Sequence, residues 1–498
     1  MDRAREAAYP SAVRPALSLV VLASLPLVAC CVGAQQPPTS AAPAPEAPAA
    51  PSASPPRGVI LVSMDTVRAD RTTPYGAPAE ATPVFAALAA ESVVFERAYS
   101  QANETLFSHG SFLAGRITSH VAPVDYDFTI PEGTPTLAGQ MRMAGYRTGA
   151  VVAGGHLARV FGLDDGFDTY TEGSTFGSFQ ETVPMALRWL DQTVADGAPF
   201  FLFLHGYDAH SPYFKPGVFG RISTPGLGTR FGTMMHSPLF YELVQGDAYF
   251  PDFRTEGRPN QKGKMFPDLG FYAAFRKYTS NPDAPRVPVT PDDKAFMLGS
   301  YASAVLYADL WMGVLMQELE RRQLLSTTTV MVISDHGEAL LDYGTMSHRH
   351  TLRSAATHVP MIVRPAGGAP PVRVATPVSL LDVAPTLLAL AGAPVAPGME
   401  GRSLVECFAG ACSQGRLPYS EDAIREASVT DGVHRLVVEG LFPTQPTFDE
   451  AVRTGSGARF LVYDVASGEQ DDRAEDPAMA PVMARLRESM LAVRAGVP

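Results

Sequence analysis

The chain has 498 residues, of which 46% are hydrophobic, so it is long enough to bury a large core and to fold as one large domain with a smaller one. Its net charge of -12 and its isoelectric point near 5.4 argue against a nucleic-acid partner, because such binding needs a concentrated basic face. The composition predicts a globular protein and gives no indication of its oligomeric state.

The first 57 residues are predicted to lie outside the folded part of the chain. Arginines at positions 3, 5 and 14 precede an apolar run over 16–30 that is too short to span a bilayer and is typical of a secretory signal peptide. The run closes on the letters LVAC, which resemble a bacterial lipobox, so residues 1–30 are interpreted as a lipoprotein signal peptide and Cys30 as the lipidated residue. Cleavage after Ala34, which would leave a soluble secreted protein, is the alternative.

Residues 31–57 are rich in proline and alanine and are expected to form an extended tether. The combination predicts an exported lipoprotein of the bacterial outer membrane, periplasm or cell surface, associated with the membrane through its N-terminal lipid.

From residue 58 the chain alternates predicted strands and helices. Apolar runs predict strands over 58–64, 92–98, 148–153, 199–204 and 329–333, and helical patterns cover 82–90, 105–115, 136–144, 183–194, 301–319 and 381–390. This alternation predicts an α/β fold with a mixed, mostly parallel central sheet sandwiched by helices. Residues 58–415 would form this catalytic domain, and 416–498 a smaller C-terminal α+β subdomain. The aromatic stretch 211–300 has no clear period and is interpreted as an insertion, either a lid or substrate-recognition region or surface elaboration.

Thr105 is the candidate nucleophile. The segment around it indicates a loop that delivers this hydroxyl to the first turn of a short helix, with Ser108 able to cap the helix and Gly115 ending it. A helix N-terminus offers free amide protons and a partial positive charge, which stabilise an oxyanion or a phosphate-like group. A threonine near a helix start is more often a plain cap, so the interpretation depends on what activates it.

Three polar residues that follow apolar strands supply a candidate metal site. Asp65 follows the strand over 58–64, and Asp335 and His336 follow the strand over 329–333. Carboxylate oxygens and an imidazole nitrogen suit a divalent cation. A cation that also touches Thr105 would lower the pKa of its hydroxyl and so provide the missing activation.

Five stretches in chain order carry a family resemblance. They cover residues 64–70, 103–116, 208–213, 334–338 and 348–352, and the likeness continues in 381–387, 398–404, 463–465 and 468–470. In content and order they resemble the motifs of the sulfatase family within the alkaline phosphatase superfamily, over essentially everything from residue 58 onward. The resemblance implies an ester hydrolase with that family's fold.

The same resemblance assigns roles to individual residues. It makes Asp65, Asp335, His336 and Thr105 the metal ligands, with Thr105 also the nucleophile. His210 would be the leaving-group acid or a substrate contact.

Two further histidines are assigned in the same way. His348 would contact the oxygens of the transferred group, with His350 as its alternative. His156 corresponds to the family's histidine near the nucleophile, and a structural role for it remains equally open.

The chain departs from the family pattern at the nucleophile. Family sulfatases carry a cysteine or serine that becomes formylglycine, with proline two residues on and arginine four on, whereas this chain has Thr105, Phe107 and His109, and His109 joins the candidate catalytic residues. A hydrated aldehyde can expel sulfate through its second hydroxyl, which threonine lacks, so threonine favours phosphoryl chemistry. The Asp-His pair at 335–336, in place of Asp-Asn, favours one zinc or manganese ion, with calcium as an alternative.

These observations predict a metal-dependent hydrolase that cleaves phosphate- or sulfate-type esters through a covalent Thr105 intermediate, with phosphodiesters or phosphonate monoesters favoured. The alternatives are a sulfuric ester hydrolase, an envelope transferase of the phosphoethanolamine or phosphoglycerol type, and a non-catalytic glycan- or lipid-binding lipoprotein. The substrate would be a small-molecule, glycan or lipid ester. Cys407 and Cys412 lie close together in an exported chain and are expected to form one disulfide.

Overall fold

The computed structural model describes residues 56–122, 128–211, 213, 291–344, 346–349, 351–410, 412–422, 426–440 and 447–496. Several expectations fall outside these residues: the signal peptide with Cys30, the tether as far as residue 55, residues 212 and 214–290 of the insertion, and His350.

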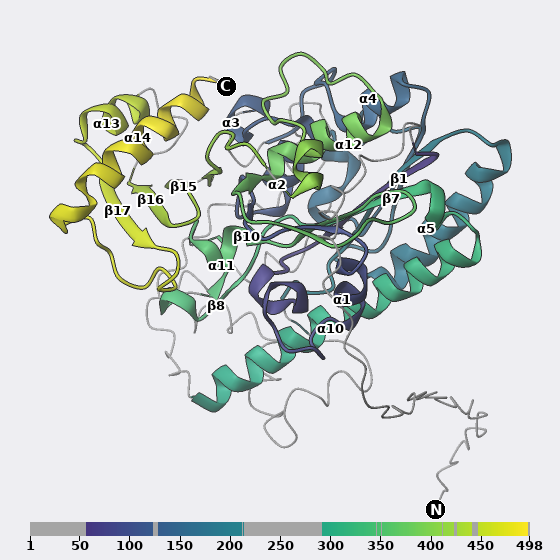
Figure 1. The fold of residues 1–498 in the computed structure, drawn as a ribbon, viewed down its shortest axis with the longest axis horizontal. Coiled ribbons are helices and arrows are strands. Elements are labelled where there is room, and N and C mark those ends of the chain that lie inside the picture. The colour runs from purple at the N-terminus through teal and green to yellow at the C-terminus, as the bar shows by residue number, and fades with distance from the viewer. Residues whose placement is uncertain are drawn as a thin grey trace, which may run out of the picture. The chain divides into compact units, whose positions relative to one another are not determined.

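A mixed sheet of eight strands forms the centre of the described part of the chain (Figure 1). In spatial order the strands are β12 (Val372–Val374), β2 (Val93–Phe95), β11 (Met361–Arg364), β7 (Thr328–Ser334), β1 (Gly58–Met64), β6 (Phe200–Gly206), β4 (Arg147–Val152) and β5 (Thr169–Glu172). β11 runs antiparallel to both of its neighbours, and the other pairs of this sheet are parallel. The predicted mixed, mostly parallel sheet is therefore confirmed.

The middle strands are buried along their whole length. Every residue of β1, β6 and β7 is buried, as their nearly continuous apolar sequences predict for strands covered on both faces. β1 lies between β6 and β7 and is parallel to both, so all three strands end at the same edge of the sheet.

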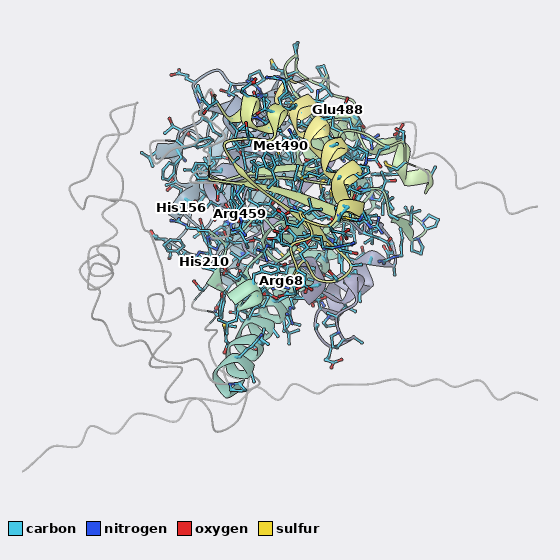
Figure 2. The ribbon with its side chains drawn as sticks, turned by 90° about the vertical axis from the view of Figure 1, so that its left-hand side faces the viewer. Arg68, His156, His210, Arg459, Glu488 and Met490 are labelled. Atoms are coloured by element: carbon cyan, nitrogen blue, oxygen red, sulfur yellow. A yellow bond between two sulfur atoms is a disulfide. The ribbon has the colours of Figure 1, made fainter. Side chains whose placement is uncertain are left out.

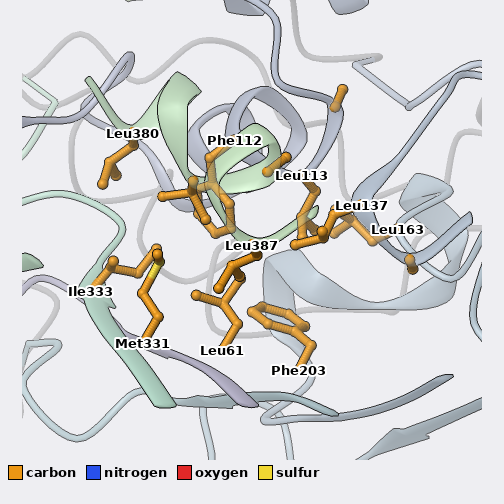
Figure 3. Close-up of a cluster of buried hydrophobic side chains, with 14 of the residues drawn as sticks. Leu61, Phe112, Leu113, Leu137, Leu163, Phe203, Met331, Ile333, Leu380 and Leu387 are labelled. Carbon is orange, nitrogen blue, oxygen red and sulfur yellow. The ribbon is translucent and has the colours of Figure 1, made fainter. Parts of the chain in front are cut away.

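Helices cover both faces of this sheet (Figure 1). On one face lie α2 (Thr105–Ala114), α4 (Leu137–Met143) and α12 (Val383–Ala391), and on the other lie α1 (Pro83–Ala89), α5 (Phe179–Thr193) and α10 (Pro291–Arg321). Figure 3 shows the first of these cores, in which Leu61, Phe203 and Met331 of the three middle strands face Phe112 of α2 and Leu387 of α12. This packing holds α2 against the sheet and so determines where its first residue lies.

Two helices begin before the residues that their sequence patterns indicate. α5 starts at Phe179 and not at Val183, and Pro184 lies inside it. The cause is a tertiary cap, because the amide of Phe179 donates to Asp208 Oδ2 at 2.8 Å. α10 likewise starts at Pro291 and not at Tyr301.

The residue at the N-cap position of α1 does not cap it with its side chain. Thr82 occupies the N-cap position, but its hydroxyl oxygen accepts from the amide of Thr73 at 2.7 Å. The cap comes instead from Asp309 of α10, which accepts from the amides of Val84 and Phe85 at 2.9 and 2.8 Å. A carboxylate at a helix N-terminus accepts hydrogen bonds from the free amides and interacts favourably with the helix dipole. Asp309 therefore caps α1 in place of Thr82.

The C-terminal part forms its own antiparallel sheet, as expected for a smaller α+β unit. Its strands and helices are β14 (Tyr419–Glu421), β15 (Glu426–Thr430), β16 (His434–Glu439), β17 (Arg459–Asp464), α13 (Phe448–Thr454) and α14 (Ala480–Arg494). Short elements complete the fold: β3 (Ala98–Tyr99), β10 (His358–Val359), β13 (Val378–Ser379), β8 (Ala339–Leu340), β9 (Met346–Ser347), α3 (Thr118–Val121) and α11 (Ser354–Thr357). Within the described ranges, no helix has the length and apolar character needed to cross a bilayer.

Candidate active site

The site begins where β1 and β7 end side by side. Met64 is paired with Ser334 in the parallel register, so the residues that follow them, Asp65 and Asp335, lie level at the edge of the sheet. The amide of Asp335 donates to Met64 O at 3.2 Å, and both aspartates are fully buried. Two carboxylates are thereby brought together out of contact with water.

Thr105 reaches these carboxylates from the first position of α2. Its hydroxyl donates to Asp65 Oδ2 at 3.0 Å and lies 3.4 Å from His336 Nε2. Asp65, Asp335 and His336 each offer a ligand atom within 4.8 Å of the others. The four residues expected to bind a metal are therefore neighbours.

The donor atoms of this cluster fit a divalent cation. Among the described residues, Asp65 Oδ1 and Asp335 Oδ2 are buried and have no hydrogen-bond partner. His336 Nδ1 lies 2.9 Å from Gly337 O, and a proton donated to that carbonyl leaves the Nε2 lone pair free for a ligand. Burial, and then the charge of Asp65, raises the pKa of Asp335. A bound cation would satisfy both carboxylates and remove their mutual repulsion.

Ser108 holds the helix to the sheet and does not cap it. Its hydroxyl donates to the backbone carbonyl of Asp335 at 2.7 Å, and Glu104, the N-cap residue, makes no side-chain capping bond. Gly115 ends α2 in the left-handed conformation, with φ of 63°, as predicted. The expected cap therefore serves to tie α2, which begins at Thr105, to the segment that follows β7.

His109 lies behind Thr105, in the protein interior. Its ring nitrogens lie 2.7 Å from Thr105 O and 2.9 Å from Ser63 Oγ, and Nδ1 is 3.6 Å from Asp335 Oδ2. Burial lowers the pKa of His109 to about 3, so the ring is neutral at physiological pH. Both ring nitrogens are thus occupied by interior groups, an arrangement suited to supporting the site, and the assignment of His109 as a catalytic residue stays a prediction.

Two of the other predicted histidines gather beside the cluster. The centroid of the His348 ring lies 4.5 Å from that of His336 and 5.6 Å from that of His210. His348 Nδ1 is 3.3 Å from Glu338 Oε1, and His210 Nδ1 is 2.7 Å from Ser211 O. Among the contacts of the described residues, neither Nε2 atom has a hydrogen bond.

His156 contacts Tyr207 and Phe176. Its amide donates to the Tyr207 hydroxyl at 3.2 Å, and its ring meets that of Phe176 edge to face, with centroids 6.3 Å apart. Burial, and to a smaller extent the electrostatic influence of Arg349, His210 and His336, lowers the pKa of His156. Figure 2 labels His156 and His210 near the same edge of the molecule. Among the contacts of the described residues, His156 is thus near the site without touching Asp65, Asp335 or His336.

Several residues of the site were not singled out from the sequence. His205 of β6 is fully buried with Nε2 at 3.8 Å from Asp65 Oδ2, and Glu338 is fully buried beside His348. Arg349 pairs with Glu104, the residue before Thr105, at 3.1 Å. Their positions in the sequence, at strand ends and next to residues already assigned to the site, could have identified them.

Cys407 and Cys412 are joined by a disulfide. These two sulfurs and Glu406 lie close enough to form a metal-ligand group, but sulfurs bonded to each other offer no thiolate to a metal. Of the groups found in the described part of the chain, the candidate metal centre is therefore the cluster at the edge of the sheet.

Comparison with known proteins shows which family the chain resembles. Residues 57–393 match the family model described as Sulfatase. Mouse arylsulfatase K is 28% identical over 229 residues, which are 45% of this chain and 37% of the mouse protein. The matched region thus spans little more than a third of the curated relative.

Solved structures share the fold at low identity. Phosphonate monoester hydrolase of Agrobacterium radiobacter is 19% identical with a TM-score of 0.63, covering 88% of this chain and 95% of that one. A protein solved in complex with its substrate D-glucosamine-2-N,6-O-disulfate is 15% identical with a TM-score of 0.64, covering 89% and 98%. With a family match over more than half of its length, on a fold that these proteins share, the chain belongs to the sulfatase family.

Proposed function

We propose that this protein is a metal-dependent hydrolase of phosphorus esters, with phosphodiesters or phosphonate monoesters as substrates and Thr105 as the nucleophile. The observation that carries the proposal is the position of the Thr105 hydroxyl, 3.0 Å from Asp65 and 3.4 Å from His336 at the start of α2. A hydroxyl in this place is next to the residues that would hold the activating metal ion and to the free amides of a helix N-terminus.

Asp65, Asp335, His336 and Thr105 would hold one divalent ion, with zinc or manganese favoured because the set includes an imidazole. When bound, such an ion lowers the pKa of a hydroxyl and neutralises charge on the transferred group. The protein's own contribution is positional: α2 and β1 bring Thr105 and Asp65 together, and Ser108 fixes the helix to β7.

The reaction would proceed in two displacements. Thr105 Oγ1, deprotonated beforehand, attacks phosphorus while the ester bond to the leaving oxygen breaks, and His210 gives that oxygen a proton. Water then attacks phosphorus and gives a proton back to His210, while the bond from phosphorus to Thr105 Oγ1 breaks and the product is released. His348, whose Nδ1 lies 3.3 Å from Glu338 Oε1, would contact an oxygen of the transferred group through Nε2.

The absence of a second hydroxyl on threonine supports phosphorus over sulfur. A sulfated threonine cannot collapse to expel sulfate, whereas phosphothreonine is open to in-line attack by water on phosphorus. Structural neighbours named as phosphonate monoester hydrolases are consistent with this choice at the level of the fold. Sulfate-ester hydrolysis is the second candidate, because the curated relatives are arylsulfatases.

We also propose that the protein is exported and lipid-anchored through Cys30, on the strength of its N-terminal sequence.

The test compares esters that share one aryl leaving group: a sulfate, a phosphate monoester, a phosphate diester and a phosphonate monoester. The purified protein is assayed with added zinc or manganese, alongside Thr105→Ala and the control Thr454→Ala, an exposed threonine of α13. We expect a phosphorus ester to be cleaved fastest and Thr105→Ala to lose about 1000-fold or more in kcat. A faster sulfate reaction would establish the second candidate, and no cleavage by the metal-loaded protein would favour a binding function.

A further inference from the structure

Phe176 has an unusual backbone conformation close to the site. Its φ is 58°, in the left-handed region that a bulky side chain rarely adopts. Such outliers persist only where the surrounding structure imposes them, and they concentrate at functional sites. The surrounding structure must therefore impose the backbone conformation of Phe176.

Hydrogen bonds on both sides of Phe176 hold this loop. The amide and the hydroxyl of Ser174 both donate to Glu181 Oε1 at 3.0 Å, and the amide of Gly177 donates to Ser174 O at 2.8 Å. The Tyr207 amide donates to Gly177 O at 2.9 Å. Together with the cap of α5 by Asp208, these bonds tie the loop to the segment that follows β6 and carries His210.

The imposed conformation places the Phe176 ring among the aromatic groups of the site. Its ring is stacked on that of His210, with centroids 5.5 Å apart and 27° between the planes. Tyr207 meets it edge on at 5.0 Å, and a Cβ on Gly155 would lie 3.4 Å from its Cε1 atom. The phenyl ring therefore supports one face of the imidazole.

We propose that Phe176 is a positioning residue for His210. The bond from Nδ1 to Ser211 O, at 2.7 Å, fixes one edge of the imidazole, and the stacked phenyl fixes its plane. These two restraints orient Nε2, the atom that would give its proton to the leaving oxygen. The proposal rests on the proposed function, in which His210 is the leaving-group acid.

Glycine and alanine variants separate the ring from the backbone. Phe176→Ala and Phe176→Gly both remove the ring, but only glycine adopts a positive φ without steric strain. Glycine ordinarily lowers stability relative to alanine, so a higher melting temperature for Phe176→Gly than for Phe176→Ala is expected only if the strain is real. The reverse order would overturn the claim of strain.

Activity is measured with leaving groups of different acidity. A 4-nitrophenolate departs without much help from an acid, whereas an alkoxide needs the proton. We expect both variants to lose about tenfold or more in kcat/KM on an alkyl ester and less than about threefold on the 4-nitrophenyl ester of the same acid, while Phe176→Tyr keeps both activities. An equal loss on both esters would indicate a merely structural role and overturn the proposal.

A second readout does not depend on catalysis. The ring protons of His210, assigned by NMR with His210→Asn, should show the ring-current shift of a stacked phenyl in the wild type and lose it in Phe176→Leu. Unchanged His210 signals would overturn the proposal whatever the activity. If the wild type cleaves no ester while the His210 signals change as expected, the proposed function fails and the positioning of His210 stands.

Discussion

Replacing Asp335 by asparagine should stabilise the metal-free protein, although most substitutions of buried residues destabilise. Asp335 Oδ1 accepts from the amides of Thr66 and His336 at 3.2 and 2.8 Å, and asparagine keeps this oxygen. Asp335 Oδ2 has no hydrogen-bond partner among the described residues, so its replacement by an amide group breaks no bond there. What changes is the charge next to Asp65.

The size of the effect follows from the separation of the two carboxylates. Their ligand oxygens lie within 4.8 Å of each other. Two unit charges at that distance and an effective dielectric constant of about 20 repel by about 3 kcal/mol. The metal-free Asp335→Asn protein should therefore gain up to about 3 kcal/mol in unfolding free energy, and it should lose most of the stabilisation by zinc because one charged ligand is gone.

Urea unfolding with a chelator, and again with excess zinc, measures both effects. The control is Asp431→Asn, because Asp431 Oδ1 also accepts two amides, from Val433 and His434 at 2.8 and 2.7 Å, while its Oδ2 faces Arg485. Loss of this partly exposed ion pair should lower stability by about 1 kcal/mol or less and leave the zinc effect unchanged.

Two results would refute the reasoning. Metal-free Asp335→Asn that is less stable than the wild type would show that the carboxylates do not repel each other in the folded state. A zinc effect as large as that of the wild type would show that Asp335 is not a ligand.

Three further predictions concern the surrounding structure. Burial raises the pKa of Asp309 from 3.8 to about 6, so the folded state binds this proton more tightly than the unfolded state. The protonated group therefore stabilises the folded state by up to about 3 kcal/mol. This stabilisation is present below about pH 4 and is lost as the pH rises through about 6. Urea unfolding across this range should show the loss in the wild type and not in Asp309→Asn. Replacing Cys407 and Cys412 by serine opens a small loop and should lower the unfolding free energy by about 2 kcal/mol, with kcat unchanged; a changed kcat would link the loop to the site. Gly337→Ala would place a methyl group against the backbone carbonyl of Ala355 and should lower the melting temperature markedly, and a soluble variant with wild-type melting would contradict this packing.

Much of the fold and part of the site follow from local sequence patterns. The apolar run over 58–64 matches β1 residue for residue, and the polar residues after β1 and β7 lie at one edge of the sheet, as the strand pattern predicts. These features are local because a buried parallel strand must be apolar along its length and can become polar only where it ends. Thr105 at the start of a helix that ends at Gly115 was likewise readable from capping preferences.

The remaining features depend on contacts between segments far apart in the chain. Asp309 caps a helix more than two hundred residues away, and Ser108, a plausible cap by its local sequence, donates instead to the carbonyl of Asp335. The left-handed conformation of Phe176 depends on its neighbours in space, since nothing in its own side chain favours it. The sequence by itself determined which polar residues follow the buried middle strands and where α2 begins, because these features depend on patterns within a short window. It did not determine where α5 and α10 begin. Only the tertiary structure decided which polar groups meet, because hydrogen bonds and charges are satisfied by whichever partner the packed core brings within reach.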